Sequence, residues 1–171
     1  VIVNRVDTAL ELHKEVEKAL NDLEPRPDVN LIHSRFRGME REKWPGRFLS
    51  RSHCENPDTN MILIATQVIE AGVDISATAL VTQLAPWPSL VQRFGRAARY
   101  GGTANVTVVD TEATGKDCLP YDETDLAAST EALALLQDVG IATLEAFEDS
   151  LRAEDPDLLN RLYRYEYIHL L

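Results

Sequence analysis

The chain has 171 residues and a net charge of −11, with 44% apolar and 26% charged residues. This is the composition of a globular protein, and it excludes a disordered chain. No stretch holds about 18 apolar residues and no charged-then-apolar leader opens the chain, so we expect neither a membrane span nor a signal peptide. Two cysteines are too few for a disulfide framework, which favours a reducing, cytoplasmic location.

The charge is unevenly distributed along the chain. Residues 1–110 carry 13 Lys and Arg against 14 Asp and Glu, whereas residues 111–171 carry 4 against 14. The acidic excess therefore belongs to the C-terminal part, and a local basic surface that binds nucleic acid is still possible in the first part.

The first part alternates short apolar runs with amphipathic segments. A helix is expected after the first run, with Thr8 and Glu11 as its capping box, and it ends before Pro25. A charged helix is also expected over residues 38–49. Apolar strands are expected at residues 1–3, 29–33, 61–65, 80–84 and 104–109. Strands without polar alternation are buried on both faces, so the sequence predicts an α/β fold in which helices sandwich a parallel sheet.

The pattern changes after Asp110. A loop over residues 111–121 precedes three acidic amphipathic helices, expected at residues 122–138, 144–152 and 156–167. We therefore predict one domain over residues 1–112. Residues 113–171 would form a short acidic helical extension, or a linker toward a further C-terminal domain. The apolar and aromatic last residues, 163–171, lead us to expect that the chain belongs to a longer polypeptide.

Residues 88–99 (PSLVQRFGRAAR) carry the most informative pattern. Laid on a helix, they place apolar side chains on one face and Gln92, Arg93, Arg96 and Arg99 on the other. No acidic residue lies within this stretch, and like charges at this spacing repel one another. Planar guanidinium groups suit phosphate oxygens, so the stretch predicts a phosphate contact, with a solvated basic face as the alternative.

This stretch resembles motif VI of superfamily 2 helicases. Residues 64–75 (IATQVIEAGVDI) resemble motif V, residues 31–36 (LIHSRF) motif IVa and residues 1–6 (VIVNRV) motif IV, all in the order of that superfamily. Motifs IVa and V are similar to those of the CRISPR-associated helicase-nuclease of type I systems. The resemblance covers residues 1–110 and is weaker beyond, and Ala97-Ala98 departs from the Gly or His that commonly precedes the last arginine.

The resemblance implies the second RecA-like lobe of an ATP-dependent single-stranded DNA helicase or translocase that acts in CRISPR interference. Two alternatives are a motor lobe of a DNA repair or restriction helicase, and a helicase-like docking module that has lost catalysis. The implied partners are single-stranded DNA, the first RecA-like lobe of the same polypeptide and the CRISPR target-recognition complex.

The resemblance also implies roles for residues around the nucleotide. Arg96 and Arg99 would act as arginine fingers on ATP, whose Mg²⁺ is held mainly by the first lobe. Gln92 and Arg93 would orient their helix and contact that lobe. Gly72 would let the backbone approach the nucleotide, and Asp74 would accept a hydrogen bond from the ribose or hold an arginine.

On the DNA side, the implied residues follow two strands, where ligands of parallel sheets bind. Thr66 would give its hydroxyl and backbone N–H to a phosphate, or else cap the next short helix. The segment from residue 33 to residue 51 holds six Lys and Arg against two Glu, which is typical of backbone contact with nucleic acid. The candidate DNA contacts are His33, Ser34, Arg35, Thr66 and Gln67.

Other motor parts are absent from the sequence. Gly115-Lys116 lacks both the earlier glycine and the following Ser or Thr of a phosphate-binding loop. The acidic run 122–125 follows a proline, so we interpret it as charge at a helix start rather than as a metal-holding box. His53 and Cys54 have no second ligand pair, and no metal site is expected.

Overall fold

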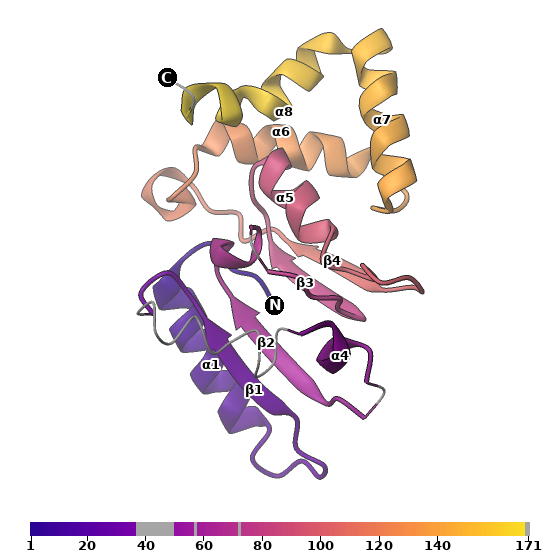
Figure 1. Cartoon of the computed structure of the whole chain (residues 1–171). Coiled ribbons are helices and arrows are strands. Elements are labelled where there is room, and N and C mark those ends of the chain that lie inside the picture. The colour runs from indigo at the N-terminus through magenta and orange to yellow at the C-terminus, as the bar shows by residue number, and fades with distance from the viewer. Residues whose placement is uncertain (37–49, 57, 72, 170–171) are drawn as a thin grey trace.

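We analysed a computed structural model of the chain, which describes residues 1–36, 50–56, 58–71 and 73–169 (Figure 1). The helix expected over residues 38–49 and the nucleotide contact expected of Gly72 lie outside the described residues.

A parallel sheet forms the centre of the first part. Strand β1 (Asp28–Ile32) pairs in parallel with β2 (Met61–Ala65), and β3 (Ala79–Gln83) pairs in parallel with β4 (Asn105–Val109). Ile2 forms parallel bridges to both Ala65 and Thr82. Residues 1–3 therefore join the two pairs into one sheet with the order β1, β2, residues 1–3, β3, β4. The expected α/β fold with a parallel sheet is confirmed.

Helix α1 (Val6–Ala19) covers one face of this sheet, beside β1 and β2 (Figure 1). Val3 and Ile64 pack on this side with Ala9 of the helix. The N-cap is Arg5, without a side-chain cap, so the capping box expected at Thr8 is wrong. The helix begins earlier because Asn4 already ends the central strand, where its Nδ2 donates to Leu84 O at 2.7 Å.

The opposite face carries the larger core. Ile2, Ile32 and Ala65 turn toward it and share one hydrophobic cluster with Trp87 and Leu90. The last two belong to α5 (Trp87–Phe94), which follows β3. Three shorter elements connect the strands or follow β4: α4 (Arg51–Cys54), η1 (Gln67–Ile69) and η2 (Gly115–Cys118).

The C-terminal part consists of α6 (Glu123–Ala134), α7 (Ile141–Glu154) and α8 (Pro156–His169). These helices lie beyond α5, at the end of the molecule away from α1 (Figure 1). The Trp87 indole is completely buried, and its N–H donates to Glu148 of α7 at 2.9 Å. Leu158 and Leu162 of α8 join the same cluster as Ile2, so the acidic helices and the sheet share one core. None of the described helices is long and apolar enough to cross a bilayer.

Candidate functional site

The arginines of motif VI do not lie on one helix. Helix α5 ends at Phe94 with Gly95 at its C-cap, so the helix expected to continue to Arg99 is wrong. After Gly95 the backbone pairs with another segment instead: Ala77 N–H donates to Arg96 O, and Ala98 N–H donates to Ala77 O at 3.0 Å. The glycine was the available signal, because helices commonly end at glycine.

Arg93 is completely buried, and each of its five N–H groups donates a hydrogen bond. Its Nε pairs with a carboxylate at 2.8 Å, and Nη1 and Nη2 each make two bonds of 3.0–3.2 Å. The acceptors are side-chain oxygens of Asn4, Glu70, Thr82 and Tyr121 and the backbone carbonyl of Gln83.

This network shows what Arg93 does within its own lobe. The side chain has no exposed surface in this conformation, and the contact with another lobe that was expected of it stays a prediction. The stretch itself has no acid, but Glu70 of motif V supplies one across the fold. Sequence reasoning missed Asn4, Glu70 and Tyr121 as hydrogen-bond partners of Arg93. The weak signal for Glu70 was its place in motif V, four residues before Asp74.

Arg96 also turns inward. Its Nε donates to Ile69 O at 3.1 Å and its Nη2 to Glu70 O at 2.6 Å, and the residue is only 9% exposed. Among the described residues, Nη1 has no hydrogen-bond partner. Burial is the main cause that lowers the pKa of Arg96, and the nearby charge of Arg99 lowers it further. Arg96 therefore attaches the middle of motif V to the end of motif VI.

Arg99 is the exposed arginine of motif VI. Its Nε lies 2.5 Å from Asp74 Oδ1, and the two side chains are 43% and 63% exposed. Of the two roles expected of Asp74, the described conformation shows the second, in which it holds an arginine. The Tyr100 hydroxyl donates to the Asp74 carbonyl at 2.9 Å, and this contact holds the end of motif VI against the Asp74 backbone. Gln92 lies exposed on α5.

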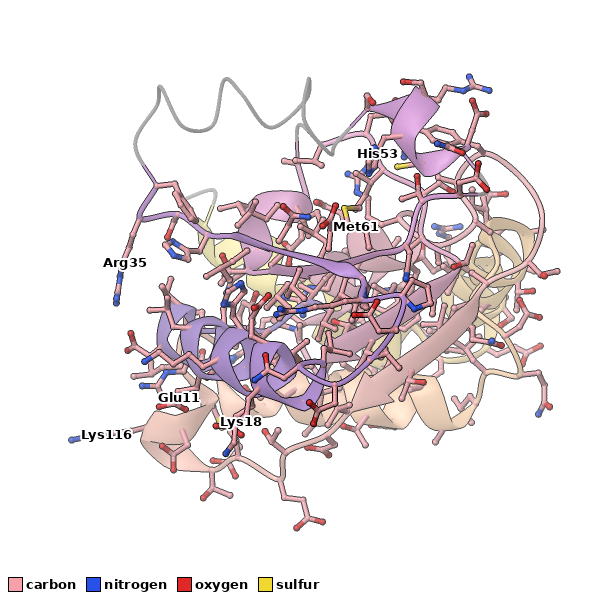
Figure 2. The ribbon with its side chains drawn as sticks, turned by 90° about the horizontal axis from the view of Figure 1, so that it is seen from below. Glu11, Lys18, Arg35, His53, Met61 and Lys116 are labelled. Carbon is pink, nitrogen blue, oxygen red and sulfur yellow. The ribbon has the colours of Figure 1, made fainter. Side chains whose placement is uncertain are left out.

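The segment after β1 places two of its three candidate side chains at the surface. Ser34 and Arg35 are exposed, and Arg35 projects away from the body of the molecule toward solvent (Figure 2). Its Nη1 lies 3.1 Å from Asp7 of α1, in a pair exposed on both sides. His33 is buried, stacks on Phe36 at 4.4 Å, and accepts the Arg35 N–H at Nδ1. His33 therefore shapes the turn that presents Ser34 and Arg35.

Motif V holds two candidate DNA contacts, of which Thr66 is buried and Gln67 is half-exposed. Thr66 is 1% exposed, and its backbone N–H donates to Ile32 O at 3.2 Å, so this N–H is already bonded within the sheet, and the phosphate contact expected of Thr66 stays a prediction. Thr66 occupies the N-cap position of η1 without a side-chain cap bond. Gln67 is half-buried, and its Nε2 donates to Asn4 O at 2.7 Å.

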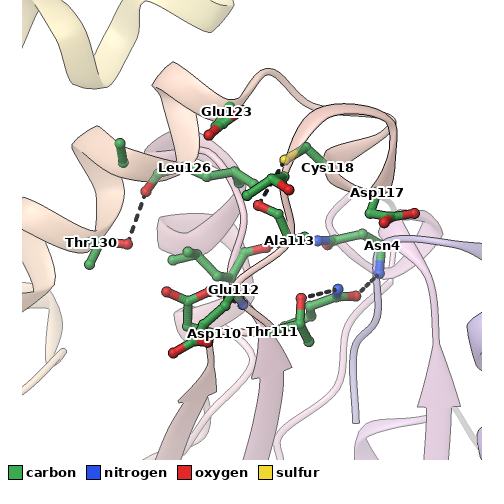
Figure 3. A pocket seen from close by; sticks show the side chains of 14 residues that line it. Asn4, Asp110, Thr111, Glu112, Ala113, Asp117, Cys118, Glu123, Leu126 and Thr130 are labelled. Atoms are coloured by element: carbon green, nitrogen blue, oxygen red, sulfur yellow. Dashed lines mark hydrogen bonds between the residues drawn. The ribbon is translucent and has the colours of Figure 1, made fainter.

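A cavity of about 260 Å³ lies beside the hydrogen-bond network of Arg93, between the end of β4 and α6 (Figure 3). Asn4 and Gln83 line it at the sheet edge. The charged groups that line it are all carboxylates, from Asp110, Glu112, Asp117 and Glu123. Carboxylates repel a triphosphate, so this cavity does not suit ATP.

Comparisons with known proteins agree with the motif order. The family model described as "CRISPR-associated nuclease/helicase Cas3, C-terminal" matches residues 1–102. The chain is 31% identical over 156 residues to the CRISPR-associated helicase Cas3 of Thermoproteus tenax. That alignment covers 91% of this chain and 25% of the relative, so the chain spans a quarter of its length.

Solved structures show the same fold. T. fusca Cas3 with ADP superposes with a TM-score of 0.73 at 21% identity, over 98% of this chain and 22% of that one. A chain of a "CRISPR RNA-guided surveillance complex, pre-nicking" has a TM-score of 0.63 at 19% identity, over 99% of this chain and 23% of that one. The fold and motifs define the C-terminal RecA-like lobe of a superfamily 2 helicase. More particularly, the chain belongs to the CRISPR-associated nuclease/helicase Cas3 family.

Proposed function

We propose that this chain is the second motor lobe of an ATP-dependent helicase or translocase that moves on single-stranded DNA during CRISPR interference. In this proposal ATP binds in the cleft between this lobe and a first RecA-like lobe of the same polypeptide. The fold of one chain in a surveillance complex supports the CRISPR target-recognition complex as a further partner.

The observation that carries the proposal is the position of Arg99. Its charge is paired with a carboxylate that is itself mostly exposed, and such pairs are worth only about 0.2–1 kcal/mol. A triphosphate carries several charges and competes easily with one exposed aspartate. Arg99 can therefore leave Asp74 when ATP and the first lobe approach.

Arg96 supports Arg99 in this scheme. Two of its nitrogens hold the carbonyls of motif V, and the remaining Nη1 is the group that would face phosphate. Positive charge on the γ-phosphate oxygens stabilises the transition state, and an arginine finger contributes about 10³–10⁵ in rate. The described residues contain no group of three potential metal ligands, so the proposal places Mg²⁺ on the first lobe.

Single-stranded DNA would cross the carboxyl edge of β1 and β2. Ser34 and Arg35 are the exposed groups there, and Gln67 is half-exposed. Contacts of this kind bind the phosphate backbone and give affinity without sequence readout. His33 and Thr66 contribute by shaping the two strand ends, since both are buried.

The test is Arg99→Ala in the full-length protein that contains this chain. We expect ATP turnover stimulated by single-stranded DNA to fall about 10³-fold or more, because the finger acts on the transition state. The Kd for single-stranded DNA and the circular dichroism spectrum should be unchanged. Turnover is measured by phosphate release and DNA affinity by fluorescence anisotropy.

Arg152→Ala is the matched control, because Arg152 is also exposed and also paired with one exposed acid, Asp149 on the same helix. We expect this variant to retain wild-type turnover. Unchanged turnover in Arg99→Ala would contradict the motor assignment and favour a docking module without catalysis. Arg96→Ala should also lose turnover, and its circular dichroism spectrum separates that loss from damage to motif V.

A further inference from the structure

One side chain from the acidic C-terminal part belongs to the hydrogen-bond network of Arg93. Tyr121 precedes α6 and lies beyond residue 102, where the family model ends. It is 4% exposed, and its hydroxyl accepts a hydrogen bond from Arg93 Nη2 at 3.2 Å. The C-terminal part therefore does more than pack against α5.

The same hydroxyl connects motif V to motif VI. Besides Arg93, which bonds it, the side chains of Gln67 and Ser89 lie near enough to this hydroxyl to affect its pKa. Gln67 belongs to the segment proposed to meet DNA, and it also donates to Asn4 O. Arg93 bonds Asn4 Oδ1 in turn, so hydrogen bonds lead from Gln67 through Asn4 and Arg93 to Tyr121.

The chemistry of Tyr121 suits this position. Burial is the main cause that raises the pKa of its hydroxyl, so the proton stays on at neutral pH. A protonated hydroxyl can accept a hydrogen bond from Arg93 and donate one at the same time. Phenylalanine would fill the same space and provide neither bond.

We propose that Tyr121 is a positioning residue of the motor, whose hydroxyl makes the DNA-side segment at Gln67 and Arg93 of α5 move together. This inference rests on the proposed function. It names the residue that couples the two ligands of the motor, ATP and single-stranded DNA. Coupling between two sites typically changes the coupled quantity about 5- to 150-fold, and here that quantity is the DNA-stimulated rate.

The experiment compares Tyr121→Phe with wild type in the full-length protein, using ATP and a single-stranded oligonucleotide. We expect the variant to lose about 5- to 20-fold of the DNA-stimulated kcat. The unstimulated ATPase rate, the KM for ATP and the Kd for the oligonucleotide should stay within about two-fold. If the hydroxyl had only a structural role, its loss would change the DNA-stimulated kcat together with the unstimulated rate, the KM and the Kd.

Tyr163→Phe is the matched control. Tyr163 also lies in the C-terminal part, and its hydroxyl donates to Glu148 at 2.6 Å rather than to a residue of the motifs. Its removal should lower Tm as Tyr121→Phe does and leave DNA stimulation intact. Equal stimulation in Tyr121→Phe and wild type, or an equal loss in both variants, would overturn the inference. If wild type itself shows no DNA-stimulated turnover, the proposed function fails instead.

Discussion

At the scale of single residues, the arginines of motif VI have different roles because they differ in burial. Arg93 is 0% exposed and binds four segments of the chain, whereas Arg99 is 43% exposed and binds one. The sequence could identify both as members of motif VI, because the motif preserves residue type and spacing. It could not separate them, because exposure depends on acceptors that lie far away in the chain, such as Asn4 and Tyr121.

Replacing Arg93 tests the structural half of this division. Arg93→Ala leaves Glu70 and several other acceptors without their donor, and breaking a buried ion pair costs about 3–5 kcal/mol. We expect the free energy of unfolding, measured by urea titration of this chain, to fall by that amount. Arg152→Ala should change it by less than about 0.5 kcal/mol. An equally small effect in Arg93→Ala would contradict the network.

At the scale of elements, the sequence predicted the sheet better than the helix ends. The strand expected at residues 61–65 has the bounds of β2, because a buried parallel strand is apolar throughout and its two ends can be recognised in the sequence. The ends of α1 and α5 were misplaced because tertiary contacts decide them. Asn4 bonds Leu84 O and starts α1 early, and Arg96 O pairs with Ala77 and stops α5 at Gly95.

The C-terminal helices offer a pH test at this scale. Arg161 of α8 donates two hydrogen bonds to Glu131 of α6, at 2.7 and 3.0 Å, and these bonds lower the pKa of Glu131. A carboxylate with a lowered folded-state pKa adds stability above its unfolded pKa of about 4.3, and this is lost as pH falls through the folded value.

Glu131→Gln should therefore have a lower Tm than wild type near neutral pH, and the difference should shrink toward about pH 3. Glu145→Gln, which changes an exposed residue of α7, serves as the control and should track wild type throughout. A Tm difference for Glu131→Gln that grows on acidification would refute the assigned pair.

At the scale of the whole molecule, the chain combines a nearly neutral sheet domain with an acidic helical cover. The acid-rich helices lie over α5, while the proposed DNA contacts lie at the ends of β1 and β2 (Figure 1). This separation keeps carboxylates away from a polyanion. The charge asymmetry was readable from the sequence, but the shared core was not, because it depends on how Trp87, Leu158 and Leu162 meet. The expected division at residue 112 stays a prediction.

The isolated chain provides the test at this scale. It contains no phosphate-binding loop, so we expect it to bind ATP weakly and to release no phosphate above background, with or without single-stranded DNA. Phosphate release from the full-length protein at equal concentration gives the positive control. Robust turnover by the 171-residue chain would refute the assignment of ATP binding to another lobe.

The central strand comes from the first three residues, and this has a consequence for biosynthesis. Ile2 finds its two parallel neighbours only at Ala65 and Thr82. During translation this segment is made before either neighbour and stays unpaired until both later strands have emerged. Its apolar side chains are exposed to aggregation throughout that interval, since such distant pairings form slowly. The strand order therefore makes the interval between synthesis of residues 1–3 and synthesis of β3 the period of greatest aggregation risk for this segment.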